Sequence, residues 1–402
     1  MVQKGLTGFF EKFLTKENIF LNKKVMLTSY QPDTILHRDE QIHLLANVLA
    51  PALRSERTSN VFIYGKSGTG KTVSVRYTLE KMNEVATEKS IMLKIIYVNC
   101  KLKKTADTEY RLIAQLAREL GHDIPPTGLP TEEVYKIFFK AIDHEQKNFI
   151  LVLDEIDQLV KKTGDEVLYN LTRINEELQH SQITLIGISN DLQFIDNIDQ
   201  RVKSSLSEEE LLFHPYNALQ LQDILNQRSK KAFREGALDQ GVIEKCAAYA
   251  AREHGDARRA IDLLRVAAEI AERKGLPAVA IAHIDEAEEK IERDRILDIV
   301  QSQPKQQQAT LLSILLLHQK RKNAMLTGEI YEVYKSTCLQ SNLRPLTQRR
   351  ISDIIGELDM MGIITAKVKS LGRYGRTREI SLATLPESNE KIKKIIEESL
   401  NL

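Results

Sequence analysis

The chain has 402 residues, with 57 Lys and Arg against 56 Asp and Glu, and its net charge is +1. A hydrophobic fraction of 42% and a charged fraction of 28% are typical of a globular chain and exclude one that is disordered throughout. Eighteen Gly, 10 Pro and 3 Cys exclude collagen-like, mucin-like and disulfide-scaffold proteins. At about 150 residues per domain, the length predicts two or three domains.

The charges are distributed unevenly along the chain. Residues 301–402 carry 16 Lys and Arg against 10 Asp and Glu, a net charge of +6, whereas residues 1–300 carry a net charge of −5. A basic C-terminal region behind an acidic body favours a polyanionic partner at that end. The alternative at this point is an ordinary solvated surface.

Cysteine spacing and hydropathy indicate where the protein resides. Cys100, Cys246 and Cys338 are far apart, form no C-x-x-C pair and predict neither a zinc site nor a disulfide framework. Apolar stretches such as 149–153 and 314–317 are much shorter than the roughly 18 residues that span a bilayer. The N-terminus lacks the pattern of a signal peptide. We therefore expect a cytoplasmic protein without a membrane partner.

A phosphate-binding motif follows the first strong strand signal. The β-prone run 61–64 precedes a segment that matches G-x-x-x-x-G-K-[ST] and consists of Gly65, Lys66, Ser67, Gly68, Thr69, Gly70, Lys71 and Thr72. Glycines let the backbone N–H groups point at phosphate oxygens, and the next helix adds its positive end. Lys71 should reach the β- and γ-phosphates, and Thr72 should hold Mg²⁺. The segment predicts a site for ATP or ADP.

Two apolar runs further along the chain end in polar residues. Residues 149–153 read as a buried parallel strand that ends in Asp154 and Glu155. We expect Asp154 to hold Mg²⁺ through water and Glu155 to polarise the attacking water. The run 183–189 ends at Asn190, which could orient that water or contact the γ-phosphate, although a strand-end Asn is usually a turn residue.

The order of these motifs resembles that of the AAA+ ATPases. Over roughly residues 15–385 the chain is similar to the archaeal origin-recognition and cell-division-control type of replication initiator. The resemblance implies an α/β fold, with a P-loop base built on a parallel sheet, an all-α lid and a C-terminal winged helix.

The resemblance also implies roles for residues outside the P-loop. Arg38 would flank the adenine, and Arg201 would be an arginine finger that reaches a neighbouring subunit. Tyr216 and Arg228 would close on the nucleotide from the hinge and the lid. Arg258 would act as the second sensor, which couples the lid angle to the nucleotide state. Without the resemblance, Arg38, Arg201 and Arg258 would each read as a surface charge and Tyr216 as a core aromatic. The segment 121–131 is similar to the insertion that such initiators use to touch duplex DNA.

The basic C-terminal region has the pattern of a winged helix. Residues 301–308 are polar and predict a linker. Helices are expected over 309–319, 328–339 and 347–361, followed by a hairpin of 363–369 and 377–382. Winged helices also bind proteins, but the arginines of the hairpin favour DNA.

Candidate DNA contacts lie on the third helix and the hairpin. Gln348 and Arg349 fall near the start of the recognition helix, where side chains reach base edges. Arg373, Arg376 and Arg378 crowd the tip of the hairpin and should meet phosphates or the minor groove.

We expect five parts in the chain: an N-terminal extension over 1–30, the ATPase base over 31–210, the lid over 211–298, the winged helix over 305–385 and a tail over 386–402. The resemblance implies a nucleoid-associated, ATP-dependent initiator that binds origin duplex DNA and helps load the replicative minichromosome maintenance helicase, with slow hydrolysis and with paralogous initiators as further partners. Two alternatives stay open, a branch-migration-type AAA+ motor and a signalling-switch ATPase whose winged helix binds protein.

Overall fold

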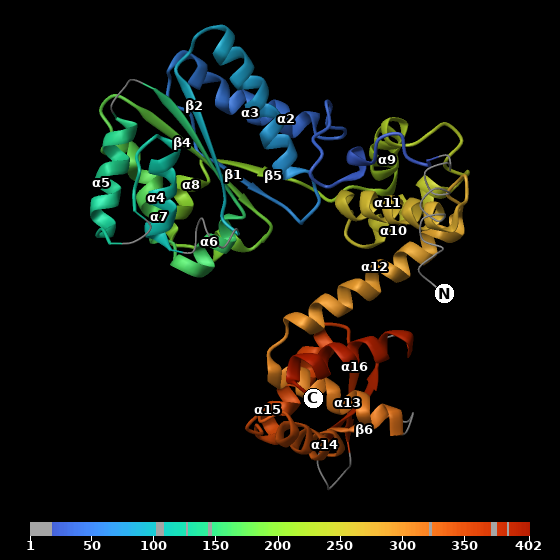
Figure 1. Cartoon of the computed structure of the whole chain (residues 1–402). Helices are drawn as coiled ribbons and strands as arrows, with labels where there is room; N and C mark the ends of the chain where they lie inside the picture. The colour runs from blue at the N-terminus through green and yellow to red at the C-terminus, as the bar shows by residue number, and fades with distance from the viewer. Residues whose placement is uncertain are drawn as a thin grey trace, which may run out of the picture. The chain divides into compact units, whose positions relative to one another are not determined.

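The computed structural model describes residues 18–101, 108–125, 128–143, 147–320, 324–370, 376–383 and 386–402. The chain forms two compact units, Met1–Ile284 and Asp285–Leu402, and each has its own hydrophobic core (Figure 1).

A five-stranded parallel sheet lies at the centre of the first unit, with the strand order β2-β3-β4-β1-β5. The strands are β1 (Val61–Tyr64), β2 (Leu93–Asn99), β3 (Asn148–Asp154), β4 (Gln182–Ser189) and β5 (Glu209–Leu212). Every residue of β3 is buried, which confirms the buried strand expected from its continuous apolar run.

Helices cover both faces of this sheet. On one face, α2 (Asp39–Leu49) and α3 (Lys71–Glu88) pack against Ile150 and Val152. On the other face, Phe149 and Leu151 share a core with five helices (Figure 1). These are α4 (Glu109–Glu119), α5 (Thr131–Ile142), α6 (Ile156–Thr163), α7 (Glu166–Arg173) and α8 (Gln200–Leu206). Because all strands are parallel, the polar residues that follow β1, β3 and β4 meet at one edge.

The lid of the first unit is helical. It comprises α9 (Ala218–Ala232), α10 (Val242–Arg252), α11 (Ala257–Lys274) and the start of α12 (Ile281–Ser302). Asp256 caps α11 by accepting hydrogen bonds from the N–H groups of Arg258 and Arg259, at 2.7 and 3.3 Å. Helix α12 continues past the expected end of the lid at residue 298 and runs into the second unit.

The described part of the N-terminal segment packs on the lid and is not a separate extension. Ile19, Phe20, Val25 and Met26 are at most 9% exposed, and a 3-10 helix over Lys23–Met26 contacts α9 and α11. Phe20 also stacks on Phe233, with 4.9 Å between the ring centroids. These apolar contacts are long-range, so the composition of residues 1–30 did not reveal them.

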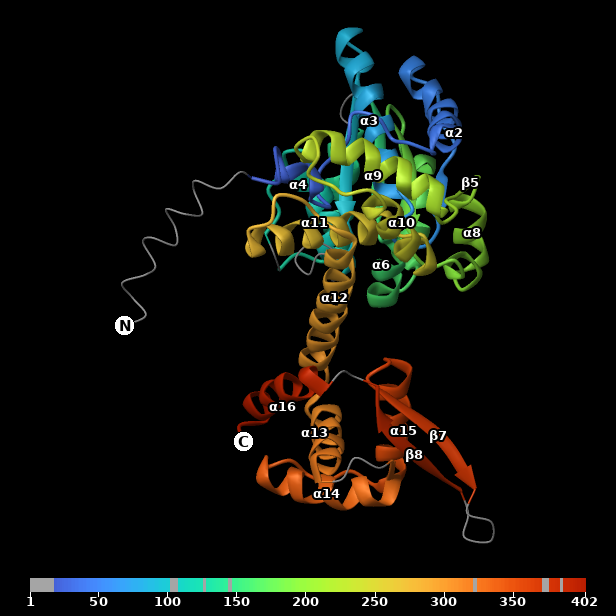
Figure 2. The same cartoon turned by 90° about the vertical axis from the view of Figure 1, so that its right-hand side faces the viewer.

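The second unit is a winged helix (Figure 2). It contains α13 (Lys305–Lys320), α14 (Thr327–Gln340), α15 (Gln348–Met360) and a three-stranded sheet in the order β6-β8-β7. The strands are β6 (Met325–Leu326), β7 (Ile364–Ser370) and β8 (Arg376–Leu382). Strands β7 and β8 form an antiparallel hairpin, which we call the wing.

Two segments of this unit differ from the sequence interpretation. The expected linker at 301–308 consists of the end of α12 and the start of α13. Gln308 in this segment is 2% exposed, and its amide donates a hydrogen bond to the carbonyl of Val300 at 3.1 Å. The tail is a helix, as its charged sequence indicates, but this helix, α16 (Pro386–Leu400), contacts α13 and buries Ile392 and Ile396 in the core of the winged helix and so belongs to that domain.

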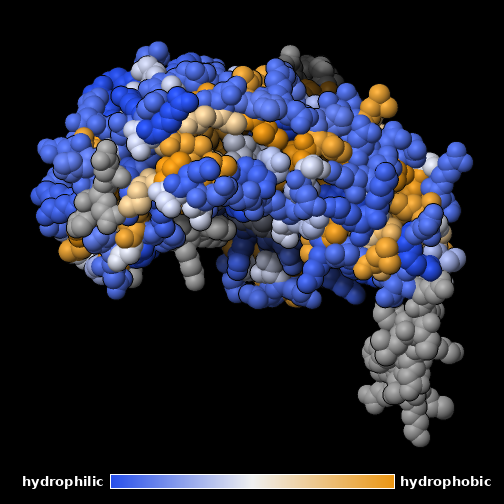
Figure 3. Space-filling view, turned by 90° about the horizontal axis from the view of Figure 1, so that it is seen from above, coloured by the Kyte–Doolittle hydropathy of each residue, from blue (hydrophilic) through white to orange (hydrophobic). Residues whose placement is uncertain are grey.

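Hydrophilic residues dominate the face shown in Figure 3, where hydrophobic residues form small separate groups. Over the described ranges, every helix is too short or too polar to cross a membrane.

Candidate nucleotide site and candidate nucleic-acid surface

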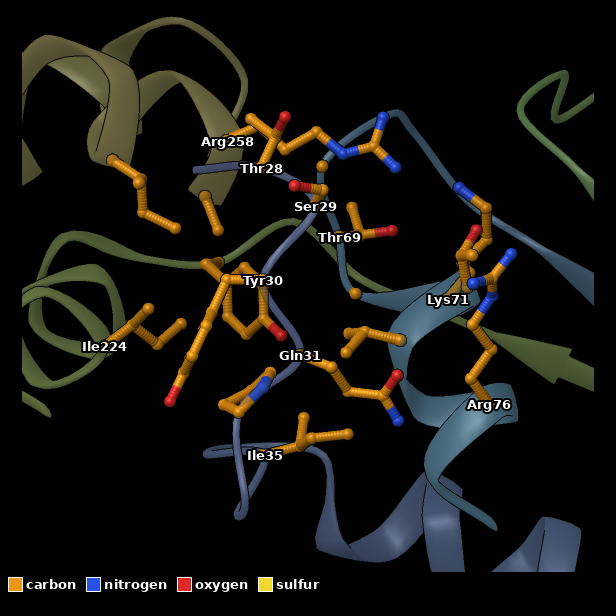
Figure 4. Close-up of a pocket in the computed structure, with 18 of the residues that line it drawn as sticks. Thr28, Ser29, Tyr30, Gln31, Ile35, Thr69, Lys71, Arg76, Ile224 and Arg258 are labelled. Carbon is orange, nitrogen blue, oxygen red and sulfur yellow. The ribbon is translucent and has the colours of Figure 1, made fainter. Parts of the chain in front are cut away.

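A cavity of about 320 Å³ opens at the edge of the sheet where the P-loop lies (Figure 4). The P-loop residues that line it are Gly68, Thr69, Gly70, Lys71 and Thr72. Its other walls come from residues 28–36, from the ends of β2, β3 and β4, and from the lid. Gly65, Lys66 and Ser67 complete the loop but lie outside the lining of the cavity.

Lys71 is held inside the loop. Its ammonium group donates to the carbonyls of Gly65 and Lys66, each at 2.7 Å, and the residue is 4% exposed. Burial lowers the pKa of Lys71 to about 8, although the carboxylate of Asp154 acts in the opposite direction. The loop therefore holds a buried cation that an anion in the cavity would stabilise.

The donors expected for Mg²⁺ lie side by side. The hydroxyl of Thr72 donates to the carboxylate of Asp154 at 3.0 Å, and the hydroxyl of Tyr97 donates to the same carboxylate oxygen. Burial beside Asp154 raises the pKa of Tyr97, so it remains a donor. A hydroxyl and a carboxylate that face a phosphate site suit Mg²⁺, which prefers oxygen ligands and retains several waters. The sequence singled out Thr72 and Asp154 but not Tyr97, which lies 57 positions earlier than Asp154.

Glu155 and Asn190 line the same cavity. Glu155 has a φ of 56°, a left-handed conformation that is strained for a residue with a side chain, and it directly precedes α6. Asn190 is fixed through its backbone, because its N–H donates to the carboxylate of Asp157 at 3.4 Å. Asp157 is 3% exposed and also accepts a hydrogen bond from Ser189 at 3.3 Å.

The lid supplies Arg258 and Tyr216. Arg258 extends over the cavity from the start of α11, on the side opposite Ile35 (Figure 4). The adjacent N–H of Ala257 donates to the carbonyl of Gly68 at 3.1 Å, so the lid touches the P-loop directly. Tyr216 is 5% exposed and contributes to the cavity wall.

Arg38 is buried between the P-loop and the segment before α9. It is 4% exposed and lies outside the lining of the cavity. Its guanidinium donates to the carbonyls of Thr69 and His214, at 2.8 and 2.6 Å, and lies 3.9 Å from the ring centroid of Tyr216. Arg38 thus ties the P-loop to the segment that leads into the lid, and its place beside an adenine stays a prediction.

The wall formed by residues 28–36 was missed by the sequence interpretation. Tyr30, Gln31 and Ile35 point into the cavity across from Lys71 (Figure 4). Arg228 lines the cavity and holds this wall, because it donates to the carbonyls of Val25 and Tyr30 at 2.7 and 3.3 Å. Its guanidinium also lies 4.7 Å from the ring centroid of Tyr30. No motif marks the segment, because contacts with a helix some 200 positions away define it.

Arg201 lies away from the cavity of its own chain. It is on α8, its side chain is 64% exposed, and it pairs with Asp199 at 3.0 Å. An arginine in this position is available to a neighbouring molecule rather than to its own nucleotide.

On the winged helix, Gln348 and Arg349 are exposed in the first turn of α15, after the cap residue Thr347. Arg373 lies outside the described residues, and of Arg376 only the backbone is described, at the start of β8. Arg378 is partly buried and donates to the carbonyl of Ser352 on α15, at 2.8 Å. Its side chain therefore faces the helix, whereas the sequence interpretation placed it among outward-facing contacts.

The segment expected to touch duplex DNA is described on both sides of residues 126 and 127, which are outside the described residues. Its end at Thr131 is the first residue of α5, as the acidic residues after it indicated.

Three known families match the chain in succession. Residues 54–195 match the AAA domain, residues 222–289 the Cdc6 AAA+ ATPase-type lid domain, and residues 298–391 the CDC6 C terminal winged helix domain. These matches agree with the base, lid and winged helix seen in the structure.

Whole-chain relatives extend the likeness. An ORC1-type DNA replication protein 1 from Methanosarcina mazei is 50% identical over 391 residues, which are 97% of this chain and 94% of that protein. An ORC1-type DNA replication protein from Pyrococcus furiosus is 52% identical over 384 residues, 94% of this chain and 91% of that protein. The solved structure of the Aeropyrum pernix ORC1 protein in complex with DNA is 45% identical, with a TM-score of 0.82 and coverage of 95% of this chain and 98% of that one. The chain therefore belongs to the family of ORC1-type DNA replication proteins, with an AAA+ ATPase domain, a Cdc6-type lid and a winged helix.

Proposed function

We propose that this protein is an ATP-dependent replication initiator that binds origin duplex DNA and helps recruit or load the replicative minichromosome maintenance helicase. ATP binding and slow hydrolysis switch it between states. The observation that carries the proposal is the combination, in one chain, of a lid-covered P-loop cavity with a winged helix whose first-turn polar residues, Gln348 and Arg349, are exposed.

The geometry of the cavity supports ATP and Mg²⁺ as ligands. Lys71 and Arg258 both supply positive charge to the cavity, and the dipole of α3 adds to it. Thr72 and Asp154 would hold Mg²⁺, which neutralises phosphate charge when it is bound. Glu155 would accept a proton from the attacking water, and Asn190 would orient that water. The finger role of Arg201 needs a second molecule, which could be a paralogous initiator.

The winged helix supports duplex DNA as the partner. The C-terminal 102 residues have a net charge of +6, and the start of α15 presents Gln348 and Arg349 to solvent. Side chains at this position of a recognition helix reach base edges in the major groove. The A. pernix ORC1 protein, which shares 45% of its sequence with this chain, was solved in complex with DNA. Membership of the ORC1-type family favours the initiator over the motor and the signalling switch.

The test is recovery of genomic DNA fragments by the purified full-length protein, at moderate salt and with competitor DNA. We expect a few sharply enriched fragments, and loss of that enrichment in Arg349→Ala and in the Arg373→Ala/Arg376→Ala double variant. Uniform recovery of all fragments by the unchanged protein would contradict a sequence-specific initiator. Absence of duplex binding even at low salt would favour the signalling switch, in which the winged helix binds protein.

A further inference from the structure

The wing has two faces, and Arg378 belongs to the inner one. Ile364 and Ile380, which are buried in the core of the winged helix, fix the inner face of β7 and β8. Residues alternate between the faces of a strand, so Arg378, two positions before Ile380, points the same way. Its partner across the hairpin is Val368. Arg378 therefore projects toward α15, beyond the end of the apolar core.

The side chain of Arg378 rests on the backbone of α15. Its Nη1 atom donates to the carbonyl of Ser352 at 2.8 Å, and residue 356, one turn further along the helix, is a glycine. A Cβ atom on Gly356 would lie 2.9 Å from Nη1 of Arg378, so the guanidinium would have to shift from its seat, and 3.6 Å from Nη2, an ordinary contact. The guanidinium thus occupies the space that any other residue at position 356 would fill.

The backbone conformation at position 356 does not require a glycine. Gly356 lies within a regular α-helix and is not among the glycines with positive φ. Glycine in a helix interior is less favourable than alanine, so its presence calls for a compensating contact. The contact that the structure provides is the guanidinium of Arg378.

We propose that Arg378 is a positioning residue, which fixes the angle between the wing and the recognition helix α15 through its seat on Ser352 and Gly356, and that it does not contact a DNA phosphate. The proposal rests on the proposed DNA-binding function. In a winged helix, the recognition helix and the wing contact different parts of the duplex, so both contacts form together only when their relative angle is correct. If the angle between the wing and α15 is fixed before binding, the free energy of ordering the wing does not reduce the affinity for DNA.

This role differs from a phosphate contact in its salt dependence. A residue that neutralises a phosphate releases counterions, and its removal reduces the slope of log K against log salt by about 0.9. A residue that only sets an angle changes the affinity and leaves the slope almost as it was, provided that the remaining phosphate contacts still form.

The experiment compares full-length variants on a recovered genomic fragment, over a series of salt concentrations. We expect Arg378→Ala and Gly356→Ala each to weaken binding by about tenfold with an unchanged slope, and the double variant to be no weaker than either single one. The matched control is Gly328→Ala in α14, where a new Cβ would lie 3.9 Å from the amide nitrogen of Gln348, an ordinary contact, so the position of the wing should be unaffected.

Two results would overturn the proposal: a reduction of the slope by about 0.9 in Arg378→Ala, or normal binding by Gly356→Ala. Amide hydrogen exchange without DNA provides a readout that does not depend on the proposed function. Exchange in residues 364–370 and 376–383 should rise in both Arg378→Ala and Gly356→Ala, and not in Gly328→Ala. If the unchanged protein bound no duplex, the proposed function would fail, and the exchange result alone would decide whether Arg378 holds the wing.

Discussion

Replacing Arg228 by alanine should weaken nucleotide binding without touching the P-loop. The guanidinium donates to the carbonyls of Val25 and Tyr30 at 2.7 and 3.3 Å, and the residue is 9% exposed. Hydrogen bonds from a charged donor contribute about 1.5–3 kcal/mol each, and the longer of the two falls below that range. Burial lowers the pKa of Arg228, which shows that desolvation of the cation offsets part of the gain. We expect the variant to lose about 2–3 kcal/mol of the free energy that holds residues 28–36 in their position.

If this loss falls on the binding step, the affinity for ATP decreases by about 30- to 140-fold, since 1.4 kcal/mol corresponds to a factor of ten. Calorimetric titration with a non-hydrolysable ATP analogue measures it. The matched control is Lys231→Ala on the same helix, whose exposed ion pair with Asp33 also joins α9 to the wall but is screened by water. The control should bind the analogue almost as well as the unchanged protein. Equal affinities of the Arg228→Ala and Lys231→Ala variants would refute the reasoning.

Three further predictions concern the chemistry of the site. Burial holds the pKa of Lys71 at about 8 without nucleotide, below its ordinary value, and bound phosphates would raise it again. Above pH 8, nucleotide binding should therefore be accompanied by uptake of a proton. Calorimetry should show that the affinity falls by up to about tenfold between pH 8 and 9. A constant affinity from pH 7 to 9 would contradict this. Glu155→Gln should keep ATP binding and lose phosphate release; persistent release would exclude Glu155 as the base. Arg201→Ala should reduce hydrolysis only at concentrations where molecules associate, and an equal loss in isolated monomers would show that it is not a finger.

Much of the phosphate end of the site could be predicted because its determinants are local. The glycine spacing defines the P-loop, and the apolar runs before Asp154 and Asn190 place both residues at one edge of a parallel sheet. The cap of α11 is local in the same sense, because Asp256 accepts a hydrogen bond from the N–H group of Arg258, two positions later.

The rest of the site depends on contacts between distant segments. The wall at residues 28–36 carries no motif, because α9 and not its own sequence determines its position. Only the family resemblance implies a place beside the adenine for Arg38, and its burial against Thr69 and His214 follows only from the tertiary structure. Arg378 shows that closeness in sequence does not give the direction of a side chain. Its closeness to the hairpin tip suggested a DNA contact, whereas the alternation of side chains from Ile380 places it on the face of the strand that is turned toward α15.

The attachment of residues 25–37 to α9 has a kinetic consequence. Arg228 bonds to Val25 and Tyr30, Gln227 to Thr34 at 2.6 Å, and Asp223 to His37 at 3.0 Å. The wall that faces the P-loop across the cavity is therefore held mainly by the lid, and a single side-chain hydrogen bond, from Gln31 to Glu80 of α3 at 2.8 Å, joins the described part of it to the ATPase base. A nucleotide in the cavity would be enclosed between the ATPase base and the lid, and it could leave only when the two separate. Its residence time would then equal the waiting time for lid opening, so a mutation that stiffens the hinge would lengthen the bound state without adding a contact to the ligand.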